Sequence, residues 1–230
     1  NRGYVNRNHT IVTLPERTFL YKNLFKNVEV YDRNKVYNNS IDLVAHSTLL
    51  KITKSLPYKP FYQNYERDKK DIYDIDYNLQ ILNSELDDFL VCIPRLKNSD
   101  TRRNLDQRYW SEFITFAKAK FNKIIVFGKG NENLDDGGKV TYVDTLRDFC
   151  SYLHHKSCKI VISTVAGPCH YAQFFSNSDN QTKLIMIDNL NLIGEHGDDP
   201  SYFHPCLNFT KIEINFIKEL LEPEKLSEML

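Results

Sequence analysis

Short runs that are apolar on both faces recur through the second half of the chain. Strands of a parallel sheet that is covered by helices on both sides carry this pattern. The runs are residues 89–93, 123–127, 140–143, 160–162 and 184–187. Between them, residues 106–120 and 145–155 repeat apolar side chains at helical spacing, so each stretch predicts a helix with one buried face. The alternation predicts a Rossmann-like domain over residues 83–205, with Cys92 as a small core residue.

The first part of the chain shows the same alternation of strand-like and helix-like stretches. The expected elements are strands at 10–14, 28–31 and 41–45 and helices at 17–25 and 47–54. Residues 55–82 then interrupt the pattern with two prolines, a cluster of aromatic residues and a charged run. Aromatic residues in such a connecting segment either pack against a domain or line a cleft. Residues 1–82 therefore predict an N-terminal Rossmann-like domain with a linker.

The last stretch, residues 206–230, predicts two short helical pieces on either side of Pro223 that pack back on the domains. Together, the segments predict an α/β protein of two Rossmann-like parallel-sheet domains that face a cleft. The chain begins with Asn1 rather than methionine, which indicates a fragment or a trimmed product. The pattern therefore leaves open whether the N-terminal domain is complete.

The charge balance and the cysteines narrow the classes of partner. The chain has 30 Lys and Arg residues and 30 Asp and Glu residues, whereas a general nucleic-acid binder usually has a basic excess. No segment approaches the roughly 20 apolar residues of a membrane span, and no secretory signal opens the sequence. The five cysteines form no C-x-x-C pair, which argues against a zinc site or a disulfide framework. We expect a cytoplasmic protein without a nucleic-acid partner, a membrane span or a metal.

The stretch from residue 160 to residue 175 is the most informative for function. An apolar strand leads into Thr164, a Gly-Pro turn follows, and His170 lies just inside the expected helix. Main-chain N–H groups at a helix N-terminus lack intrahelical partners and carry partial positive charge, so they suit a phosphate. Gly167 lets a ligand approach the main chain closely, and Pro168 suits the first helical turn. An ordinary strand-to-helix turn is the alternative interpretation.

Further candidate ligands follow the other strands of the second domain. Ligands of open parallel sheets bind at the carboxyl ends of the strands. Arginine matches phosphate oxygens with paired hydrogen bonds and lysine supplies a point charge, so cationic loops at these ends suit a pyrophosphate. The candidates for donor and phosphate binding are Arg95, Lys97, Arg102, Arg103, Gly128, Lys129, Asp144, Thr164, Gly167, Pro168 and His170.

Several of these candidates also have a simpler explanation. Arg102 and Arg103 are either phosphate ligands or solvated loop charges. Asp144 either accepts hydrogen bonds from a sugar hydroxyl or caps the helix that follows it, and we favour the cap. His170 either touches a phosphate or packs beneath the loop, which is the commoner fate. The turn at residues 128–130 lacks the spacing of a dinucleotide-binding motif or a P-loop.

A short motif and a strand with its loop link the second half to a known family. Residues 163–172 place Gly-Pro-x-His-x-Ala at a helix start, and the strand ending at Ile93 leads into a loop rich in Arg and Lys. In these features, residues 87–190 resemble the C-terminal, donor-binding domain of GT-B glycosyltransferases, particularly the heptosyltransferase-like group. The resemblance departs at Ala166, where the family usually has Ser or Asp. It implies a nucleotide-sugar donor held by Arg95, Arg102, Gly128, Thr164, Gly167 and His170.

The resemblance implies that a sugar is transferred from the nucleotide-sugar donor to a hydroxyl of a glycan or other acceptor. It implies that residues 1–82 form the acceptor-side domain, that no metal is required, and that there is no cofactor, since the nucleotide sugar is a substrate. The family takes its catalytic base from the N-terminal domain, where Glu16 and His46 are only weak substitutes, so the base either lies outside this sequence or is lost. Two other functions stay open, because one fold hosts many: a catalytically inactive nucleotide- or sugar-binding module, and a sugar-nucleotide epimerase.

Overall fold

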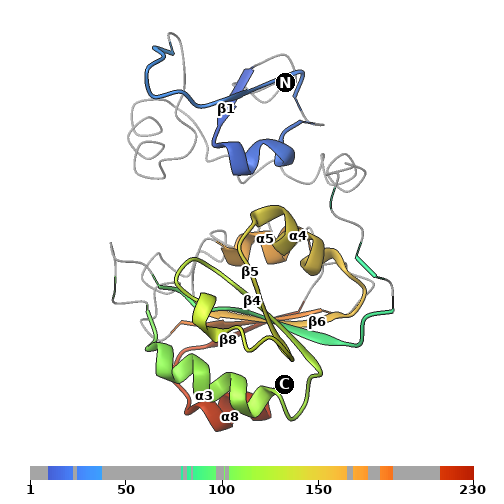
Figure 1. The fold of residues 1–230 in the computed structure, drawn as a ribbon. Helices are drawn as coiled ribbons and strands as arrows, with labels where there is room; N and C mark the ends of the chain where they lie inside the picture. Colours follow the sequence, from blue (N-terminus) through green and yellow to red (C-terminus); the bar gives the residue numbers. More distant parts are fainter. Residues whose placement is uncertain are drawn as a thin grey trace. The chain divides into compact units, whose positions relative to one another are not determined.

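The computed structural model divides the chain into two compact units, Asn1–Asn78 and Leu79–Leu230, which are described separately (Figure 1). It describes residues 10–22, 25–37, 79, 82–83, 85–96, 101, 104–164, 168–175, 182–188 and 213–230. The predicted strand at 41–45, the predicted helix at 47–54 and nearly all of the predicted linker lie outside these residues. Within the described residues, no helix has the length and apolar character needed to cross a membrane.

In the first unit, two short parallel strands are joined through a 3-10 helix. Strand β1 (Thr10–Thr13) pairs with β2 (Asn27–Val30), which confirms both predicted strands. The helix η1 (Pro15–Leu20) begins earlier than the predicted helix and ends at Leu20 rather than at residue 25. Pro15 occupies its first turn, where the missing N–H removes no helical hydrogen bond.

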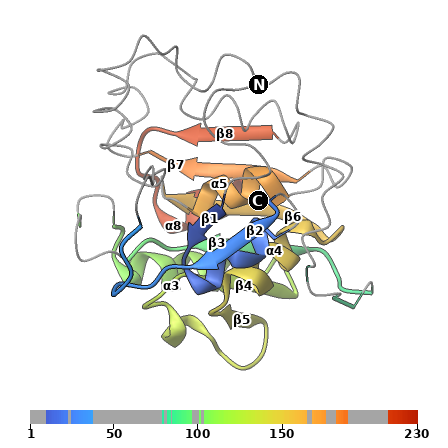
Figure 2. The ribbon, with the colours of Figure 1, turned by 90° about the horizontal axis from the view of Figure 1, so that it is seen from above.

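The second unit contains one six-stranded sheet in which every neighbouring pair is parallel. Its strands are β3 (Phe89–Ile93), β4 (Lys123–Phe127), β5 (Val140–Val143), β6 (Cys158–Thr164), β7 (Lys183–Ile187) and β8 (Glu213–Ile217). They lie in the order β5-β4-β3-β6-β7-β8, which Figure 2 shows from above. Numbered within the sheet, this order is 3-2-1-4-5-6, that of the doubly wound dinucleotide-binding fold.

Helices cover both faces of this sheet. Figure 1 shows α3 (Gln107–Ala117) and α8 (Pro223–Glu228) on one face, and α4 (Leu146–His154) and α5 (Pro168–Phe175) on the other. The fold class is therefore α/β with parallel sheets, as predicted from the short runs that are apolar on both faces. The predicted inward faces of α3 and α4 are buried, and they consist of Trp110, Phe113, Ile114, Ala117, Leu146, Phe149, Cys150 and Leu153.

Strand β3 runs through the middle of the core. All five of its residues are buried, including Cys92, as predicted for a small core residue. Burial raises the pKa of the Cys92 thiol well above its ordinary value, because a thiolate would be desolvated there. Cys92 is therefore a packing residue and is not activated as a nucleophile.

The end of the chain differs from the prediction of two helical pieces. Residues Glu213–Ile217 form β8, a sixth strand paired with β7, and within the described residues 213–230 only Pro223–Glu228 is helical. Helix α8 is held against α3 by two side chains. The Tyr109 hydroxyl donates to the Leu221 carbonyl at 2.7 Å, and Lys120 Nζ donates to the Ser227 carbonyl at 2.8 Å. The C-terminal stretch thus completes the sheet and covers one of its faces.

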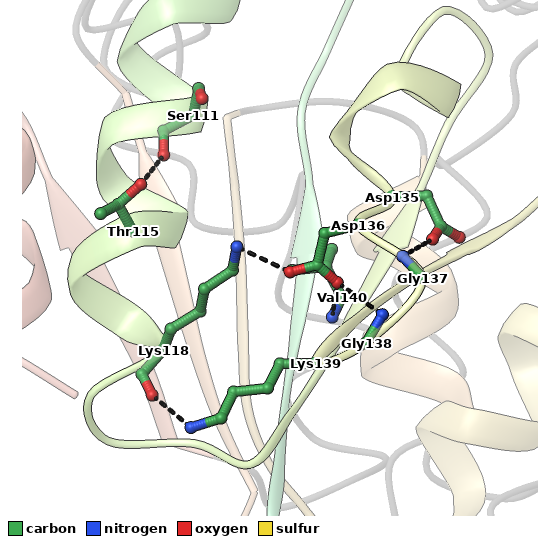
Figure 3. Close-up of polar contacts among 9 residues, drawn as sticks. All are labelled: Ser111, Thr115, Lys118, Asp135, Asp136, Gly137, Gly138, Lys139 and Val140. Carbon is green, nitrogen blue, oxygen red and sulfur yellow. Dashed lines mark hydrogen bonds and ion pairs between the residues drawn. The ribbon is translucent and has the colours of Figure 1, made fainter.

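Polar contacts close the turn that precedes β5, the outermost strand of the sheet (Figure 3). This turn lies where the parallel strands begin, which we call the amino edge of the sheet; the strands end at the carboxyl edge. One oxygen of Asp136 accepts hydrogen bonds from the main-chain N–H groups of Gly138 and Val140, at 2.9 and 2.8 Å. The other oxygen forms a 2.7 Å ion pair with Lys118 at the end of α3. The Lys118 hydrogen bond and these N–H groups lower the pKa of Asp136 to about 2. The turn therefore ties β5 to the end of α3.

Candidate functional site

The point where the strand order reverses is the natural place for a ligand in this sheet. Strands β3 and β6 are adjacent and lead to helices on opposite faces, and in open parallel sheets ligands bind beyond the carboxyl ends of such a strand pair. Ile93, the last residue of β3, is paired with Ser163 near the end of β6. The carboxyl ends of β3 and β6 therefore lie side by side. The main phosphate ligands predicted from the sequence follow these two strands.

Arg95 is the cation in the part of the loop after β3 that the structure describes. Its side chain is buried, with 7% of the residue exposed, and Nη1 donates to Asn104 Oδ1 at 2.8 Å. Asn104 in turn lies in a turn in which its N–H donates to the Thr101 carbonyl at 2.9 Å. The hydrogen bond from Arg95 thus joins the two ends of its own loop. The other cationic candidates of this loop, Lys97, Arg102 and Arg103, lie outside the described residues.

The end of β6 joins the sheet to α5 through hydrogen bonds to main-chain carbonyls. The Ser163 hydroxyl lies within hydrogen-bond distance of the carbonyls of Ile93 and Thr164, at 3.2 and 2.7 Å. The Cys169 thiol, in the first turn of α5, donates to the Thr164 carbonyl at 3.2 Å. These contacts hold the start of α5 close to the end of β6.

The expected placement of the Gly-Pro segment is confirmed where the structure describes it. Helix α5 begins at Pro168, as predicted, and His170 belongs to its first turn. Gly167 and the side chain of His170 lie outside the described residues. Their predicted phosphate contacts therefore stay predictions.

Thr164 is buried and its hydroxyl has no hydrogen-bond partner among the described residues. Alternation along β6 places Thr164 on the same face as Ile160 and Ile162, which belong to the core on the α3 side. Ser163 belongs to the opposite face, on the α5 side. At the end of β6, the sheet therefore carries one hydroxyl on each face, that of Thr164 on the α3 side and that of Ser163 on the α5 side.

The turn after β4 comes close to the loop after β3. Gly128 and Gly130 have positive φ values of 122° and 93°, which L-residues with a side chain rarely adopt. A Cβ on Gly128 would lie 3.3 Å from the Pro94 carbonyl oxygen and 3.1 Å from Asn131 Nδ2. The predicted turn out of the strand is confirmed, and the glycine is required by both conformation and space. Lys129 between the two glycines is exposed.

Asn131 is a residue of this region that the sequence analysis does not identify. It is fully buried, and its Nδ2 group donates to the Pro94 carbonyl at 3.0 Å and to the Gly128 carbonyl at 2.9 Å. Asn131 follows a Gly-x-Gly turn, which is a weak local signal. Its hydrogen-bond partner Pro94 is distant in the sequence, so the contact can be recognised only once the pairing of β3 with β4 is known.

The prediction that Asp144 caps the next helix is wrong. Helix α4 is capped by Thr145, whose Oγ1 accepts from the Asp148 N–H at 3.1 Å. The Thr145 hydroxyl also donates to the Asp148 carboxylate at 2.6 Å, which orients its oxygen toward the Asp148 N–H. Asp144 itself is exposed at the carboxyl end of β5. Its suggested contact with a sugar hydroxyl stays a prediction.

The two weak candidates for a catalytic base belong to the first unit. Glu16 is exposed on η1, directly after β1, and His46 lies outside the described residues. The catalytic base therefore stays unidentified. Within the described ranges, no three His, Cys, Asp or Glu side chains gather closely enough to hold a metal ion.

Comparisons with known proteins identify no family. No family model matches the sequence, and no curated protein matches it. Among solved structures, the chain is similar to one described as "E. coli heptosyltransferase WaaC with ADP", at 16% identity over 96% of this chain and 72% of that chain. The TM-score is 0.42, which is too low to carry an argument. The assignment of the second unit as Rossmann-like therefore rests on its strand order.

Proposed function

We propose that the chain is a glycosyltransferase whose second unit binds the diphosphate of a nucleotide-sugar donor at the carboxyl ends of β3 and β6. The supporting observation is the coincidence of three features at the reversal of strand order. These are the buried cation Arg95, the carboxyl end of β6 at Thr164, and the start of α5 at Pro168. Helix N–H groups and a guanidinium together suit a diphosphate.

The same groups would stabilise the diphosphate as it leaves the sugar. Negative charge on the leaving phosphate increases as its bond to the sugar breaks, and donors already fixed in place favour that change. Arg95 is held by Asn104, so it would need little reorganisation. No step of this proposal requires a metal ion. A base of unknown identity would remove the proton from the acceptor hydroxyl.

A thermal-shift screen with UDP, GDP, ADP and their sugar derivatives tests the donor part of the proposal. A ligand that binds only the folded state at 100 times its Kd adds about 2.7 kcal/mol of stability. For a protein of this size that raises Tm by roughly 5–10 °C. Absence of any shift with every nucleotide would contradict the proposal. Binding without sugar transfer to any hydroxyl acceptor would support an inactive binding module instead.

Removal of divalent metals tests the metal-independent part. We expect the nucleotide-induced Tm shift and any release of nucleoside diphosphate from the donor to persist in excess EDTA. The physical reason is that Arg95 and the start of α5 would supply the positive charge. Loss of both signals in EDTA, with recovery on adding magnesium, would contradict this part and leave diphosphate binding itself intact.

A further inference from the structure

The turn after β4, residues 128–134, holds both ends of the loop that carries Arg95. At the start of that loop, Asn131 Nδ2 donates to the Pro94 carbonyl at 3.0 Å. At its far end, Gln107 in the first turn of α3 donates to the Gly130 carbonyl at 3.4 Å and to the Asn133 side chain. The segment 94–106 is therefore fastened at two points to one neighbouring turn.

The turn that makes these contacts is itself tightly fixed. Asn131 Nδ2 also donates to the Gly128 carbonyl at 2.9 Å, and the Asn131 carbonyl accepts from the Leu134 N–H at 3.0 Å. The Glu132 carboxylate accepts from the Gly130 N–H at 3.1 Å. With Gly128 held at a positive φ and packed against Pro94, the turn has little freedom to shift.

The orientation of the Asn131 amide is determined by its partners. Both groups near Nδ2 are carbonyl oxygens, which only accept, so a flipped amide would place oxygen against oxygen. The Oδ1 atom is then buried without a partner among the described residues. A buried polar atom without a partner lowers stability. The two donated hydrogen bonds, which hold Pro94 and Gly128 together, therefore outweigh the cost of the unpaired Oδ1 atom.

We infer that Asn131 is a positioning residue that fixes the Arg95 loop for diphosphate binding by clasping it to the turn after β4. This inference rests on the proposed function. Asn131 acts through Pro94, next to Arg95, and need not touch the ligand. A small displacement of a positioned charged group lowers affinity strongly, because the bonds between a guanidinium and phosphate oxygens depend on direction.

The test compares Asn131→Ala with Thr182→Val. Thr182 is equally buried and donates a 2.7 Å hydrogen bond to the Cys158 carbonyl, but at the amino edge of the same sheet. Binding of the nucleoside diphosphate and of its monophosphate is measured by calorimetry, together with Tm. We expect both variants to lose Tm, but only Asn131→Ala to weaken diphosphate binding, by about tenfold or more. The preference for diphosphate over monophosphate should fall in that variant only, which a general loss of stability would not cause.

The outcomes separate this inference from the proposed function. Wild-type protein that binds no nucleotide overturns both. Wild-type protein that binds, with Asn131→Ala binding as tightly and selectively as Thr182→Val, overturns only the role of Asn131. If Asn131→Ala does not fold, Gln107→Ala is measured instead. Gln107 holds the other end of the loop to the same turn, and its side chain is only partly buried. Unchanged diphosphate affinity in Gln107→Ala would then overturn the inference.

Discussion

The two edges of the six-stranded sheet treat buried polar groups differently. At the amino edge, the buried Thr182 and Ser157 hydroxyls donate to the carbonyls of Cys158 and Leu86, at 2.7 and 2.6 Å. At the carboxyl edge, Thr164 Oγ1 and Asn131 Oδ1 have no partner among the described residues. At the amino edge these buried hydroxyls are hydrogen-bonded, whereas at the carboxyl edge two buried polar atoms of the described residues make no hydrogen bond.

A third buried polar atom supports the same contrast. Trp110 Nε1 is the remaining buried side-chain atom without a partner in the described part of the chain. Trp110 lies in the first turn of α3, which follows β3 and therefore begins at the carboxyl edge. Buried polar atoms usually find partners, so the three exceptions toward the carboxyl edge set it apart from the amino edge. The predictions below test whether binding and stability divide between the edges in this way.

The largest effect is expected from Arg95→Ala. A hydrogen bond to a charged group contributes about 1.5–3 kcal/mol, so nucleoside diphosphate binding should weaken roughly 10–100-fold. The matched control is Lys159→Ala, which removes a cation at the start of β6, where Lys159 lies 3.7 Å from Asp88. Calorimetric titration should show the loss in the first variant only. Equal affinities for the two variants would remove Arg95 from the site.

An intermediate effect is expected from Gly128→Ala. A side chain at a φ of 122°, with the Asn131 amide and the Pro94 carbonyl at close range, should lower the free energy of unfolding by about 1–3 kcal/mol. It should also weaken diphosphate binding, because the clasp would shift. Gly137→Ala is the control: Gly137 has a φ of 65° in the β5 turn and open space around its Cβ position.

Urea denaturation and nucleotide titration of both glycine variants distinguish the two edges. Gly137→Ala should lower the free energy of unfolding by about 1–2 kcal/mol and leave affinity unchanged. A loss of affinity in Gly137→Ala as large as in Gly128→Ala would show that the edges do not differ in this respect.

The smallest effect is expected at Asp136. Its pKa is lowered from an ordinary 3.8 to about 2, so its contribution to stability is complete above about pH 4 and is lost as the pH falls toward 2. Asp136→Asn should therefore flatten the loss of stability between pH 4 and pH 2 in urea titrations. At neutral pH the variant should lose less than about 1 kcal/mol, because a third of the side chain is exposed and screened by solvent. A variant curve parallel to the wild-type curve down to pH 2 would contradict this.

The core strands could be predicted because burial on both faces is visible in the sequence itself. Residues such as Val91 and Ile125 leave no polar face, so the runs containing them indicate central parallel strands. The same rule does not find strand β8, because apolar and polar residues alternate at its start instead of forming a continuous apolar run. The alternation of Ile212, Ile214 and Phe216 was its signal, but the helix-like residues that follow it in sequence obscured the change of period.

The sequence predicts which candidate residues follow each strand, but not the contacts between residues that follow different strands. Placing Arg95 and Pro168 at one edge needs just the rule that ligands bind at carboxyl ends of parallel strands. The clasp could not be predicted, because Asn131 meets Pro94 only through the pairing of β3 with β4. The capping role of Thr145 was also open to error, since Asp144 beside it is an equally good capping residue and the choice depends on the first helical dihedral angles.

The most direct measurement of the central claim is an NMR titration of the backbone amides with a nucleoside diphosphate. The account predicts that the largest shifts occur at Arg95, Lys129, Thr164 and Cys169, while Gly138 and Thr182 at the amino edge stay unchanged. Shifts centred on the amino edge or on the first unit, or no saturable shift at all, would contradict it.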